Sequence, residues 1–416
     1  MIRKFDNLKL TSQFTFCPYA FSLDLYEGCP HRCTYCFSQQ AYYINKSFKS
    51  KNIQFDSIRG ILNLEKIEKY LIGQYRNSKN QITRLLQYLF DIKQPLHVGG
   101  MYDPFPRGVE NVYRIGKKFL ELMNKYQYPV IFSTKNPPVE YIDLFRQGKY
   151  ILQVSIPFNK KYGDIVEKGA LPVEKRFEAI KKIRPYVKKV VVRMQPYIIG
   201  IMSDKELEEH ITNIKNSGAD AVTVEFLKFQ VFQPKGCYQM EKLSEEVGIN
   251  LKNKLTEVEG PDWVYPIHSR KRELLKIKEM VHAHSLEFYS AENSLRDEGD
   301  GFACCGINHN NDSEKDFYTK LRYTTNEALF IAKEKGEVCL SDIINNQKHK
   351  ELFEFKNILP MWNTRNRKYR SKYNNLRFVD FIKNNWNTKS PTNPAIFFKR
   401  LYPFKKGGEV CYKYKK

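Results

Sequence analysis

The feature that most constrains the fold is an alternation of strand-type and helix-type segments between residues 79 and 229. The strand-type runs are short, apolar and rich in Val and Ile, and the segments between them carry apolar residues at spacings of three and four. Strands joined through helices pair in parallel, so the sequence predicts an α/β fold that closes as a full or partial barrel or stays open between helix layers. We predict helices over 79–92, 109–126, 139–147, 172–187 and 203–218, and strands over 95–100, 128–134, 150–158, 188–198 and 220–229.

A further helix-strand pair over 269–290 continues this pattern, which stops near residue 311. We therefore predict a core over 1–310 and a separate C-terminal region over 311–416. Within that region, residues 325–346 are predicted as two short helices around a turn, a spacing that is compatible with a helix-turn-helix. Parallel folds of this class place their chemistry at the C-terminal ends of the strands.

The net charge of +23 indicates a polyanionic partner. Residues 361–416 hold fifteen Lys and Arg against two acids, Asp380 and Glu409, and the cations are interleaved with aromatic residues. Phosphate neutralisation and base stacking need this mixture. The alternative is a Lys- and Asn-rich composition with no functional meaning. We predict a nucleic-acid partner, DNA in preference to RNA, whose affinity falls steeply with salt and depends on residues 361–416.

The chain shows neither a membrane segment nor an export signal. No run of about 18 apolar residues occurs, and the first residues contain no apolar signal segment. Nine cysteines scattered along the chain argue against a secreted disulfide framework. We therefore expect a cytoplasmic protein with reduced thiols and no membrane partner, whose oligomeric state the sequence does not specify.

Three of the nine cysteines lie within eight positions of the stretch "LYEGCPHRCTYCFSQQ", at Cys29, Cys33 and Cys36. Thiolates at this spacing bind zinc or an iron-sulfur cluster, and the alternative is a set of small buried side chains. Structural zinc takes four protein ligands, and without a second CxxC pair His31 would have to be the fourth. A four-iron cluster with three protein ligands leaves one iron open to an outside chelator.

The CxxxCxxC motif, with the aromatic Tyr35 before its last cysteine and a β-α alternation after it, resembles the radical SAM superfamily. The blocks "YEGCPHRCTYCF", "GGMYDPFPRGVE", "IFSTKN", "VEKGALPVEKRFEAIKKI" and "VVVRMQPYIIGIMSDKELEEHI" are similar to the spore photoproduct lyase and DNA repair photolyase branch, in the same order. The resemblance covers about residues 15–290. It implies a partial (β/α)6 TIM-like barrel of the radical SAM type with a basic C-terminal extension.

The resemblance also implies the cofactors. Cys29, Cys33 and Cys36 would hold a 4Fe-4S cluster, and S-adenosylmethionine (SAM) would chelate the fourth iron. One electron, from a donor such as flavodoxin or ferredoxin, would cleave SAM into methionine and a 5′-deoxyadenosyl radical that abstracts hydrogen from the substrate.

Further site residues follow from the same resemblance. Glu167 and Arg176 match an acidic and a basic position of that branch, with a simple ion pair as the alternative. Gln195 and Glu225, which point inward from strands of such a barrel, are expected to line the site. Glycine pairs also suit any tight turn, and an Asp before Pro also suits a turn, so these assignments have structural alternatives. The residues implied to contact SAM or shield the cluster are Tyr35, Gly99, Gly100, Asp103, Ser133, Lys135, Ser155 and Arg193.

Spore photoproduct lyase uses a cysteine to return a hydrogen atom. We favour Cys304 and Cys305 in "GDGFACCGI" for this role, because glycines on both sides allow the loop to approach a ligand. A second cluster built from this pair and Cys237 is an alternative. The remaining cysteines outside the motif are Cys17, Cys339 and Cys411.

The sequence thus predicts a radical SAM enzyme that acts on nucleic acid, with spore-photoproduct-type repair of a pyrimidine lesion as one form of that activity. One alternative is a radical SAM enzyme that modifies RNA, a peptide or a small molecule. The other is a non-enzymatic nucleic-acid-binding protein stabilised by zinc.

Overall fold

The computed structural model describes most of the chain. The described residues are 2–11, 13–14, 17–44, 55–231, 237–260, 262–301, 303–309, 311–320, 324–345, 350–356, 376–389, 392–398 and 400–415, and the side chains of 41–44, 324–326 and Phe397 are not among the described atoms.

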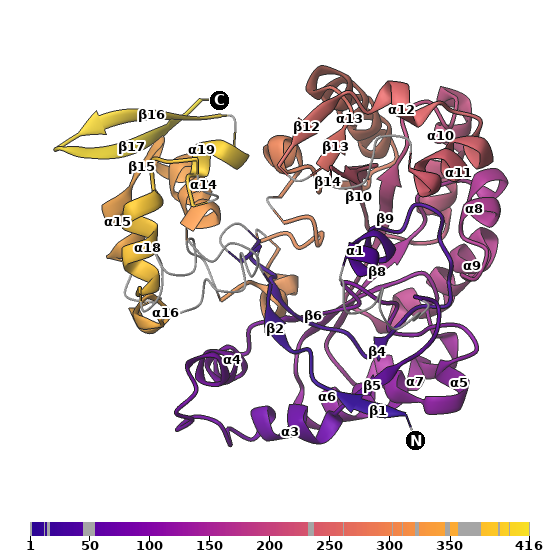
Figure 1. Cartoon of the computed structure of the whole chain (residues 1–416), viewed down its shortest axis with the longest axis horizontal. Helices are drawn as coiled ribbons and strands as arrows, with labels where there is room; N and C mark the ends of the chain where they lie inside the picture. The colour runs from indigo at the N-terminus through magenta and orange to yellow at the C-terminus, as the bar shows by residue number, and fades with distance from the viewer. Residues whose placement is uncertain are drawn as a thin grey trace.

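The core is an eight-stranded sheet with the order β14-β10-β9-β8-β7-β6-β3-β2 (Figure 1). Seven of these strands run parallel, and β2 (Lys9–Leu10) pairs antiparallel with β3. The two outer strands, β14 and β2, do not pair with each other in the described part of the chain, so the sheet forms a partial barrel. The parallel strands are β3 (Phe21–Leu23), β6 (Leu96–Val98), β7 (Val130–Thr134), β8 (Tyr150–Ser155), β9 (Lys189–Tyr197), β10 (Ala221–Phe226) and β14 (Glu287–Ser290).

The predicted alternation is confirmed in every helix and strand between 79 and 229, and the predicted pair over 269–290 supplies α13 (Ile267–Ala283) and the seventh parallel strand. The sequence analysis did not predict β3 or the helix α8 (Lys160–Val166), because both are too short to show a period. The helices between the strands are α4 (Gln81–Asp91), α5 (Glu110–Tyr113), α6 (Ile115–Tyr126), α7 (Ile142–Arg146), α9 (Val173–Ile183) and α10 (Asp204–Asn216).

Local sequence signals explain where the helices begin. The Ser203 side chain accepts the N–H of Glu206, whose carboxylate accepts the N–H of Ser203, so a capping box starts α10. Asn80 and Asn159 cap α4 and α8 in the same way through single side-chain oxygens. The apolar faces of these helices pack on strands that are buried along nearly their whole length, as parallel strands between helices must be.

The chain after β14 closes the open side of the barrel. Gln153 of β8 donates to the carbonyl of Cys304 at 3.4 Å, which places this segment over the inner face of the sheet. Further along, Tyr19 donates to the carbonyl of Phe317 at 2.9 Å and Thr319 donates to that of Pro18 at 2.9 Å. The segment that follows the last parallel strand therefore lies against the segment that precedes the first. It includes the 3₁₀ helices η3 (Asn293–Glu298) and η4 (Asp312–Phe317).

Two small sheets flank the barrel. One joins β1 (Arg3–Phe5), β5 (Gly60–Leu62) and β4 (Tyr26–Glu27), and the other joins β11 (Phe229–Gln230), β13 (Asp262–Val264) and β12 (Glu257–Glu259). The remaining helices of this part are α1 (Phe37–Ile44), α3 (Leu64–Leu71), α11 (Tyr238–Val247) and α12 (Leu251–Lys254).

The C-terminal region has its own antiparallel sheet, β15-β17-β16, packed with helices at the left of Figure 1. Arg400 links it to the barrel through ion pairs with Asp297 at 3.5 Å and Glu298 at 3.2 Å. Its elements are α14 (Thr324–Lys335), β15 (Glu337–Cys339), α15 (Leu340–Ile344), α16 (Lys350–Glu354), α18 (Phe378–Asn385), α19 (Pro394–Phe397), β16 (Leu401–Lys406) and β17 (Glu409–Tyr414).

Two expectations for this region need correction. Residues 325–346 do contain two helices, but β15 lies between them and pairs with β17, so a helix-turn-helix over 325–346 is wrong. Cys339 and Cys411 form a disulfide, so the expectation of reduced thiols fails for these two. They lie directly opposite each other on neighbouring antiparallel strands, with Cα atoms 4.1 Å apart, a pairing that the spacing of 72 residues did not reveal.

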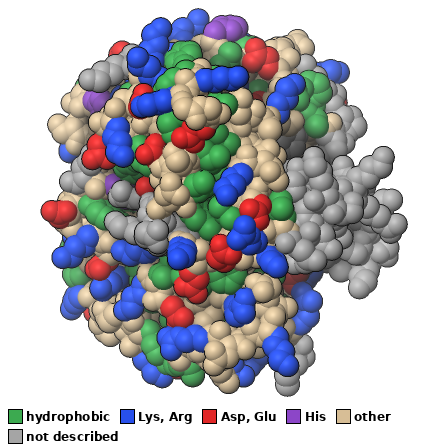
Figure 2. All heavy atoms as spheres, turned by 90° about the vertical axis from the view of Figure 1, so that its left-hand side faces the viewer, with side chains coloured by type: hydrophobic (Ala, Val, Ile, Leu, Met, Phe, Trp, Pro, Cys, Tyr) green, Lys and Arg blue, Asp and Glu red, His purple; other side chains and the backbone are tan. Residues whose placement is uncertain are grey.

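The described surface around the C-terminal region carries both signs of charge. Figure 2 shows Lys and Arg side chains interspersed with Asp and Glu on this face rather than gathered into one basic patch. The stretch 357–375, which has five Lys and Arg and no acid, lies outside the described residues. No helix in the described ranges is both long and apolar enough to cross a membrane.

Candidate active site

Cys29, Cys33 and Cys36 lie on one loop between β4 and α1, beyond the C-terminal end of β3. Close backbone packing holds this loop. Gly28 has φ +115°, and a Cβ there would lie 2.1 Å from the carbonyl oxygen of Ser57. Gly169 approaches from the barrel side, where a Cβ would lie 2.3 Å from the Pro30 carbonyl oxygen. Glycine is thus required on both sides of the loop.

Backbone N–H groups affect two of the three cysteine sulfurs. Those of Asp103 and His31 lower the pKa of Cys29, and those of Ser38 and Gln39 in the first turn of α1 lower the pKa of Cys36. Burial nevertheless raises the pKa of the Cys29 thiol to about 12 and also raises that of Cys36. Without a metal the Cys29 and Cys36 thiols are therefore neutral, and binding a metal centre there releases protons. Hydrogen bonds to sulfur of this kind tune iron-sulfur clusters.

The spacing of the three sulfurs bears on the choice between zinc and an iron-sulfur cluster. Around one zinc ion with Zn–S bonds of about 2.3 Å, tetrahedral sulfurs lie roughly 3.8 Å apart. Among the described residues, the only group of three metal-ligating side chains whose donor atoms all lie within 4.8 Å of one another is Cys339, Glu409 and Cys411. Cys29, Cys33 and Cys36 do not meet that limit. In the group that does meet it, Cys339 and Cys411 already form a disulfide. A cluster that gives each cysteine its own iron fits the loop better than one zinc ion.

A buried ion-pair network supports the loop from the barrel. Glu167 accepts a hydrogen bond from Tyr35 and pairs with Arg176 at 2.5 Å and with Lys135 at 3.1 Å. The predicted pair of Glu167 and Arg176 is therefore confirmed. Burial by itself raises the pKa of Glu167, but the two cations outweigh it and bring that pKa to about 2. Lys135 also donates to Ser155 and lies 5.3 Å from the centre of the Tyr35 ring.

The turn after β6 is built around Asp103. Its carboxylate accepts hydrogen bonds from the Thr134 hydroxyl at 2.8 Å, the Lys135 amide at 2.6 Å and the Phe105 amide at 2.9 Å. Asp103 thus fixes the C-terminal end of β7 as well as its own turn. Its side chain is already committed to protein donors, so the structure gives it a positioning role.

The two glycines at the end of β6 differ. Gly99 has φ +93°, and a Cβ there would lie 2.3 Å from the carbonyl oxygen of Ser133. A Cβ on Gly100 would meet no atom within 4 Å. Gly99 is needed for the fold, whereas Gly100 borders open space. The next two amides, of Met101 and Tyr102, donate to buried Asp24 at 2.9 and 3.2 Å. Asp24 was not predicted, because it follows a strand too short to recognise.

Polar side chains form a hydrogen-bonded row across the inside of the barrel. Ser133 lies at its centre, 2.9 Å from His97, 2.7 Å from Gln153 and 2.9 Å from Arg193. Gln153 is buried and His97 is half-buried on otherwise apolar strands, at positions that a period-two pattern would have assigned to core, so neither was predicted. The row continues from Arg193 through Gln195, Glu225 and Lys228 to Glu292.

Cys304 and Cys305 lie beside this row, over β8 and β9. The Cys304 carbonyl binds Gln153, and a Cβ on Gly306 would lie 2.5 Å from Val191. A hydrogen bond from Cys305, with help from Arg296 and Arg193, lowers the pKa of Cys304 to about 6, whereas the pKa of Cys305 is raised. At neutral pH the pair therefore keeps one proton, which Cys305 donates in a hydrogen bond to Cys304. Cys237 precedes α11, in whose first turn Gln239 donates to the Cys36 carbonyl at 3.2 Å.

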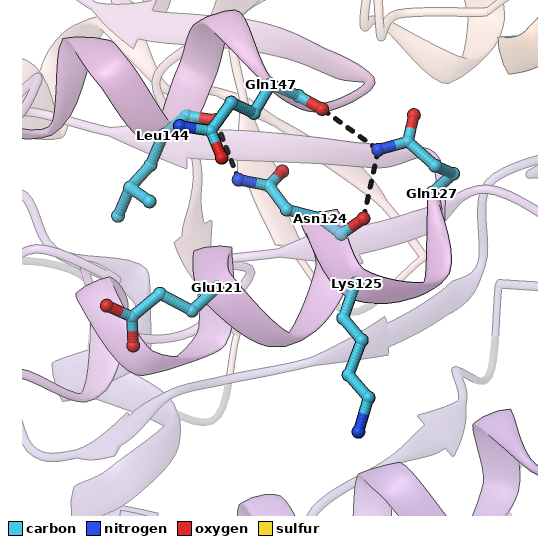
Figure 3. Close-up of a pocket in the computed structure, with 6 residues that line it drawn as sticks. All are labelled: Glu121, Asn124, Lys125, Gln127, Leu144 and Gln147. Carbon is cyan, nitrogen blue, oxygen red and sulfur yellow. Dashed lines mark hydrogen bonds between the residues drawn. The ribbon is translucent and has the colours of Figure 1, made fainter.

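A surface cavity lies away from these residues. It has a volume of about 310 Å³ and is formed by the ends of α6 and α7, at the edge where β7 and β8 begin (Figure 3). The side-chain amide of Asn124 binds the carbonyl of Leu144, and that of Gln127 binds the carbonyls of Asn124 and Gln147. These amides stabilise helix ends, and the cavity is at the opposite end of the strands from the cysteines.

Comparisons with known proteins give a likeness in fold only. No protein-family model matches the chain, and no curated protein matches it. Similar solved structures include a spore photoproduct lyase variant with bound AdoMet and dinucleoside spore photoproduct, 16% identical, covering 70% of this chain and 80% of that one with a TM-score of 0.49. Methylornithine synthase (PylB) is 11% identical over 65% of this chain and 70% of its own, with a TM-score of 0.35. SuiB of Streptococcus suis, bound to S-adenosylmethionine, is 11% identical over 66% of this chain and 51% of its own, with a TM-score of 0.38.

Proposed function

We propose that the chain is a radical SAM enzyme that acts on nucleic acid. The observation that carries this proposal is the loop of Cys29, Cys33 and Cys36, whose sulfurs do not all lie within 4.8 Å of one another and whose Cys29 and Cys36 thiols are influenced by backbone amides. The loop lies at the C-terminal end of a parallel partial barrel, where such folds place their chemistry. The CxxxCxxC motif and the blocks similar to the photolyase branch agree with it.

The three cysteines would hold a 4Fe-4S cluster, and the cluster with SAM bound would supply a 5′-deoxyadenosyl radical. The chain's own residues prepare the space beside it. Gly100 leaves room for a ligand, and Tyr35 shields the loop. The ammonium group of Lys135 has three N–H donors. In the described structure two of them are directed at Glu167 and Ser155, so the third can bind the carboxylate of SAM. Ser133 and Arg193 provide further polar contacts.

The vicinal pair Cys304 and Cys305 is the proposed hydrogen-atom donor. It lies on the inner face of the sheet, beside Arg193 and Gln153, and its shared proton keeps one S–H bond available at neutral pH. A thiol here would return a hydrogen atom to a substrate radical in the barrel. The second-cluster alternative loses support, because Cys237 precedes α11 and does not join a group of close donors among the described residues.

Nucleic acid is the proposed substrate class because of the charge of the chain. Of the fifteen Lys and Arg in residues 361–416, five lie in the stretch 365–372. Counterion release makes such binding strongly dependent on salt. We propose DNA, and a pyrimidine lesion of the spore-photoproduct type within it. RNA, peptide and small-molecule substrates are outcomes that the same experiment separates. Residues 311–416 are proposed to form the binding region.

The decisive test is anaerobic. Purified protein with a reconstituted cluster is incubated with SAM and reductant, alone and with UV-irradiated DNA, undamaged DNA or RNA, and products are identified by mass. We expect 5′-deoxyadenosine in every reduced sample and recovered thymine only with irradiated DNA. Protein that holds one zinc and no iron would contradict the proposal. 5′-Deoxyadenosine without any change to DNA would redirect it to another substrate.

The role of the basic stretch has a separate test. Replacing Arg365, Arg367, Lys368, Arg370 and Lys372 with Gln keeps the length of the chain and spares the sheet that a deletion of 361–416 would remove. We expect the slope of log affinity against log salt to become less steep for DNA. A matched control replaces exposed lysines of the barrel, Lys160, Lys161 and Lys175, with Gln. Equal slopes in the two variants would contradict a binding role for the stretch.

A further inference from the structure

Cations from the barrel and from the C-terminal region meet at the junction of the two, where α19 packs on η3 (Figure 1). Arg400, just before β16, contacts the η3 carboxylates of Asp297 at 3.5 Å and Glu298 at 3.2 Å. From the barrel, Lys271 of α13 lies 3.6 Å from the Glu298 carboxylate, and Lys278, two turns further along the same helix face, donates to the Glu298 carbonyl at 2.8 Å. One acidic turn therefore holds cations of both regions.

Two more lysines of the C-terminal region lie in the same place. Burial lowers the pKa of Lys333 on α14, and the charges of Asp297, Arg400 and Lys278 also act on it, so its ammonium group is close to theirs. Lys415 donates its amide to the Arg400 carbonyl at 2.9 Å. We call the whole set the junction cations: Lys271, Lys278, Lys333, Arg400 and Lys415.

The positive charge of the junction faces solvent, whereas its negative charge does not. The side chains of Lys271 and Arg400 are 54% and 40% exposed, and Lys415 is exposed as well. The side chains of Asp297 and Glu298 are only 4% and 10% exposed. Five cations are thus gathered over two inward carboxylates, which leaves an outward excess of positive charge that a polyanion can neutralise.

Other acids near these helices are turned away or bonded elsewhere. Glu279 and Glu334 each directly follow a junction cation, and consecutive residues of an α-helix point about 100° apart. Asp300 pairs with His282 at 2.9 Å and accepts the Phe288 amide at 2.7 Å. Figure 2 shows both signs of charge over the outer face of the C-terminal region, so the junction differs from that face.

An exposed aromatic ring adjoins the junction cations. Tyr402 of β16 is 51% exposed, and the Lys415 ammonium lies 5.8 Å from the centre of its ring. A nucleic-acid strand offers phosphates to cations and base faces to an aromatic ring, and proteins that bind single strands combine these two contacts. An acidic protein surface or an anionic lipid surface offers the charge without the bases.

We propose that a nucleic-acid strand crosses this junction, with its phosphates on the junction cations and a base stacked on Tyr402. The inference rests on the proposed function and refines it, because Lys271 and Lys278 belong to the barrel and not to residues 311–416. The strand then runs beside η3, the turn that precedes the proposed hydrogen-atom donors Cys304 and Cys305 on the same segment.

The test is binding of a fluorescein-labelled single-stranded DNA to the reconstituted protein without SAM, by anisotropy over a range of KCl concentrations. K271Q/K278Q removes two cations of the barrel, and K333Q/K415Q removes two of the C-terminal region. The slope of log affinity against log salt should become less steep by about 1.4 in each variant, since each phosphate contact on a single strand contributes about 0.7. Should K278Q disturb the turn that its ammonium holds, K271Q alone should give half of that change.

Two controls separate charge from structure. K271R/K278R keeps both charges and should keep the slope of the parent. K276Q/K335Q changes lysines of the same two helices that pair with Asp204 at 2.7 Å and Asp342 at 3.7 Å, and it should also leave the slope unchanged.

Stacking on Tyr402 has its own readout. Y402A should raise the Kd for the single strand at least about fivefold. The Kd for inorganic polyphosphate, measured by competition, should not change, because polyphosphate has no bases.

Three results would overturn the inference: a slope in K271Q/K278Q equal to that of K276Q/K335Q, a slope in K271R/K278R as shallow as that of the Gln variant, or an unchanged Kd for the single strand in Y402A. Failure of the proposed function is distinct, because iron content and 5′-deoxyadenosine formation are measured on the same preparation. A parent that binds iron and cleaves SAM, with equal slopes in all variants, would refute the junction alone.

Discussion

The loop of Cys29, Cys33 and Cys36 and the pair of Cys339 and Cys411 use cysteine in opposite ways. In the loop the three sulfurs do not all lie within 4.8 Å of one another, backbone amides influence the Cys29 and Cys36 thiols, and close packing requires Gly28 and Gly169 on its two sides. The C-terminal pair stands face to face across two antiparallel strands, with Cα atoms 4.1 Å apart, and closes into a disulfide. The comparison teaches that the backbone around a thiol, and not the number of thiols nearby, decides between ligation and pairing.

The largest effect is expected from removing the cysteines of the loop, which should abolish iron binding. Replacing Cys29, Cys33 and Cys36 with Ala should abolish iron binding and the absorption of an iron-sulfur protein at about 400 nm. Replacing Cys339 and Cys411 with Ala should leave both unchanged. Iron per chain and the visible spectrum of anaerobically reconstituted protein measure this. Iron retained by the triple variant would refute the assignment of the loop.

The next effect tests the buried support of the loop. E167Q leaves Arg176 charged and buried without its carboxylate, so we expect a loss of about 3–5 kcal/mol in the free energy of unfolding. The double variant E167Q/R176M removes both charges and should lose less than the sum of the single changes. Urea denaturation of the metal-free protein gives these values. Additive losses would show that the two residues act independently.

Reduction of the C-terminal disulfide should have a more local effect. Closing a loop over 72 residues stabilises the folded state by about 4 kcal/mol in the chain-entropy model. Reduced protein should therefore show faster hydrogen exchange in β15, β16 and β17, with no change in the barrel strands. Mass spectrometry of exchanged peptides measures this. Faster exchange in β7 and β8 as well would mean that the two regions unfold together.

Lowering the pH should reduce the stability that Glu167 contributes, by a smaller amount than the substitutions above. The pKa of Glu167 is about 2 in the folded protein against an ordinary value of 4.5, because Arg176 and Lys135 outweigh the effect of burial. The stabilisation from this group is therefore complete above pH 4.5 and is lost as the pH falls toward 2. The difference in stability between the parent and E167Q should shrink over that range. Unfolding curves from pH 6 to pH 3 measure it, and a constant difference would exclude the linkage.

The smallest effect is expected at an exposed pair. Lys175 and Glu178 lie 2.9 Å apart, but their side chains are 59% and 52% exposed. K175M/E178Q should change stability by less than about 1 kcal/mol, since solvent screens such pairs. A loss as large as that of E167Q would show that burial does not explain the importance of the Glu167 network.

Most of the barrel was predictable because its strands and helices have strong and different periods. The strand of residues 130–134 and the helix of residues 204–216, for example, carry their signals locally, the latter with a complete capping box. The site was predictable only where residue types carry chemistry by themselves, as with the three cysteines. Asp24, His97 and Gln153 were missed because their roles depend on partners from other segments, 20 to 77 residues away.

The sequence by itself determined the parallel α/β class, the three-cysteine loop and the excess of positive charge, because each is written in local spacing or composition. Only the tertiary structure decided that Cys339 and Cys411 pair, that Asp103 fixes its neighbours through hydrogen bonds, and that Nε2 of buried His31 has no hydrogen-bond partner among the described residues. These facts arise from contacts between segments far apart in the chain. No local pattern encodes them, since burial and hydrogen-bond partners exist only after the chain has folded.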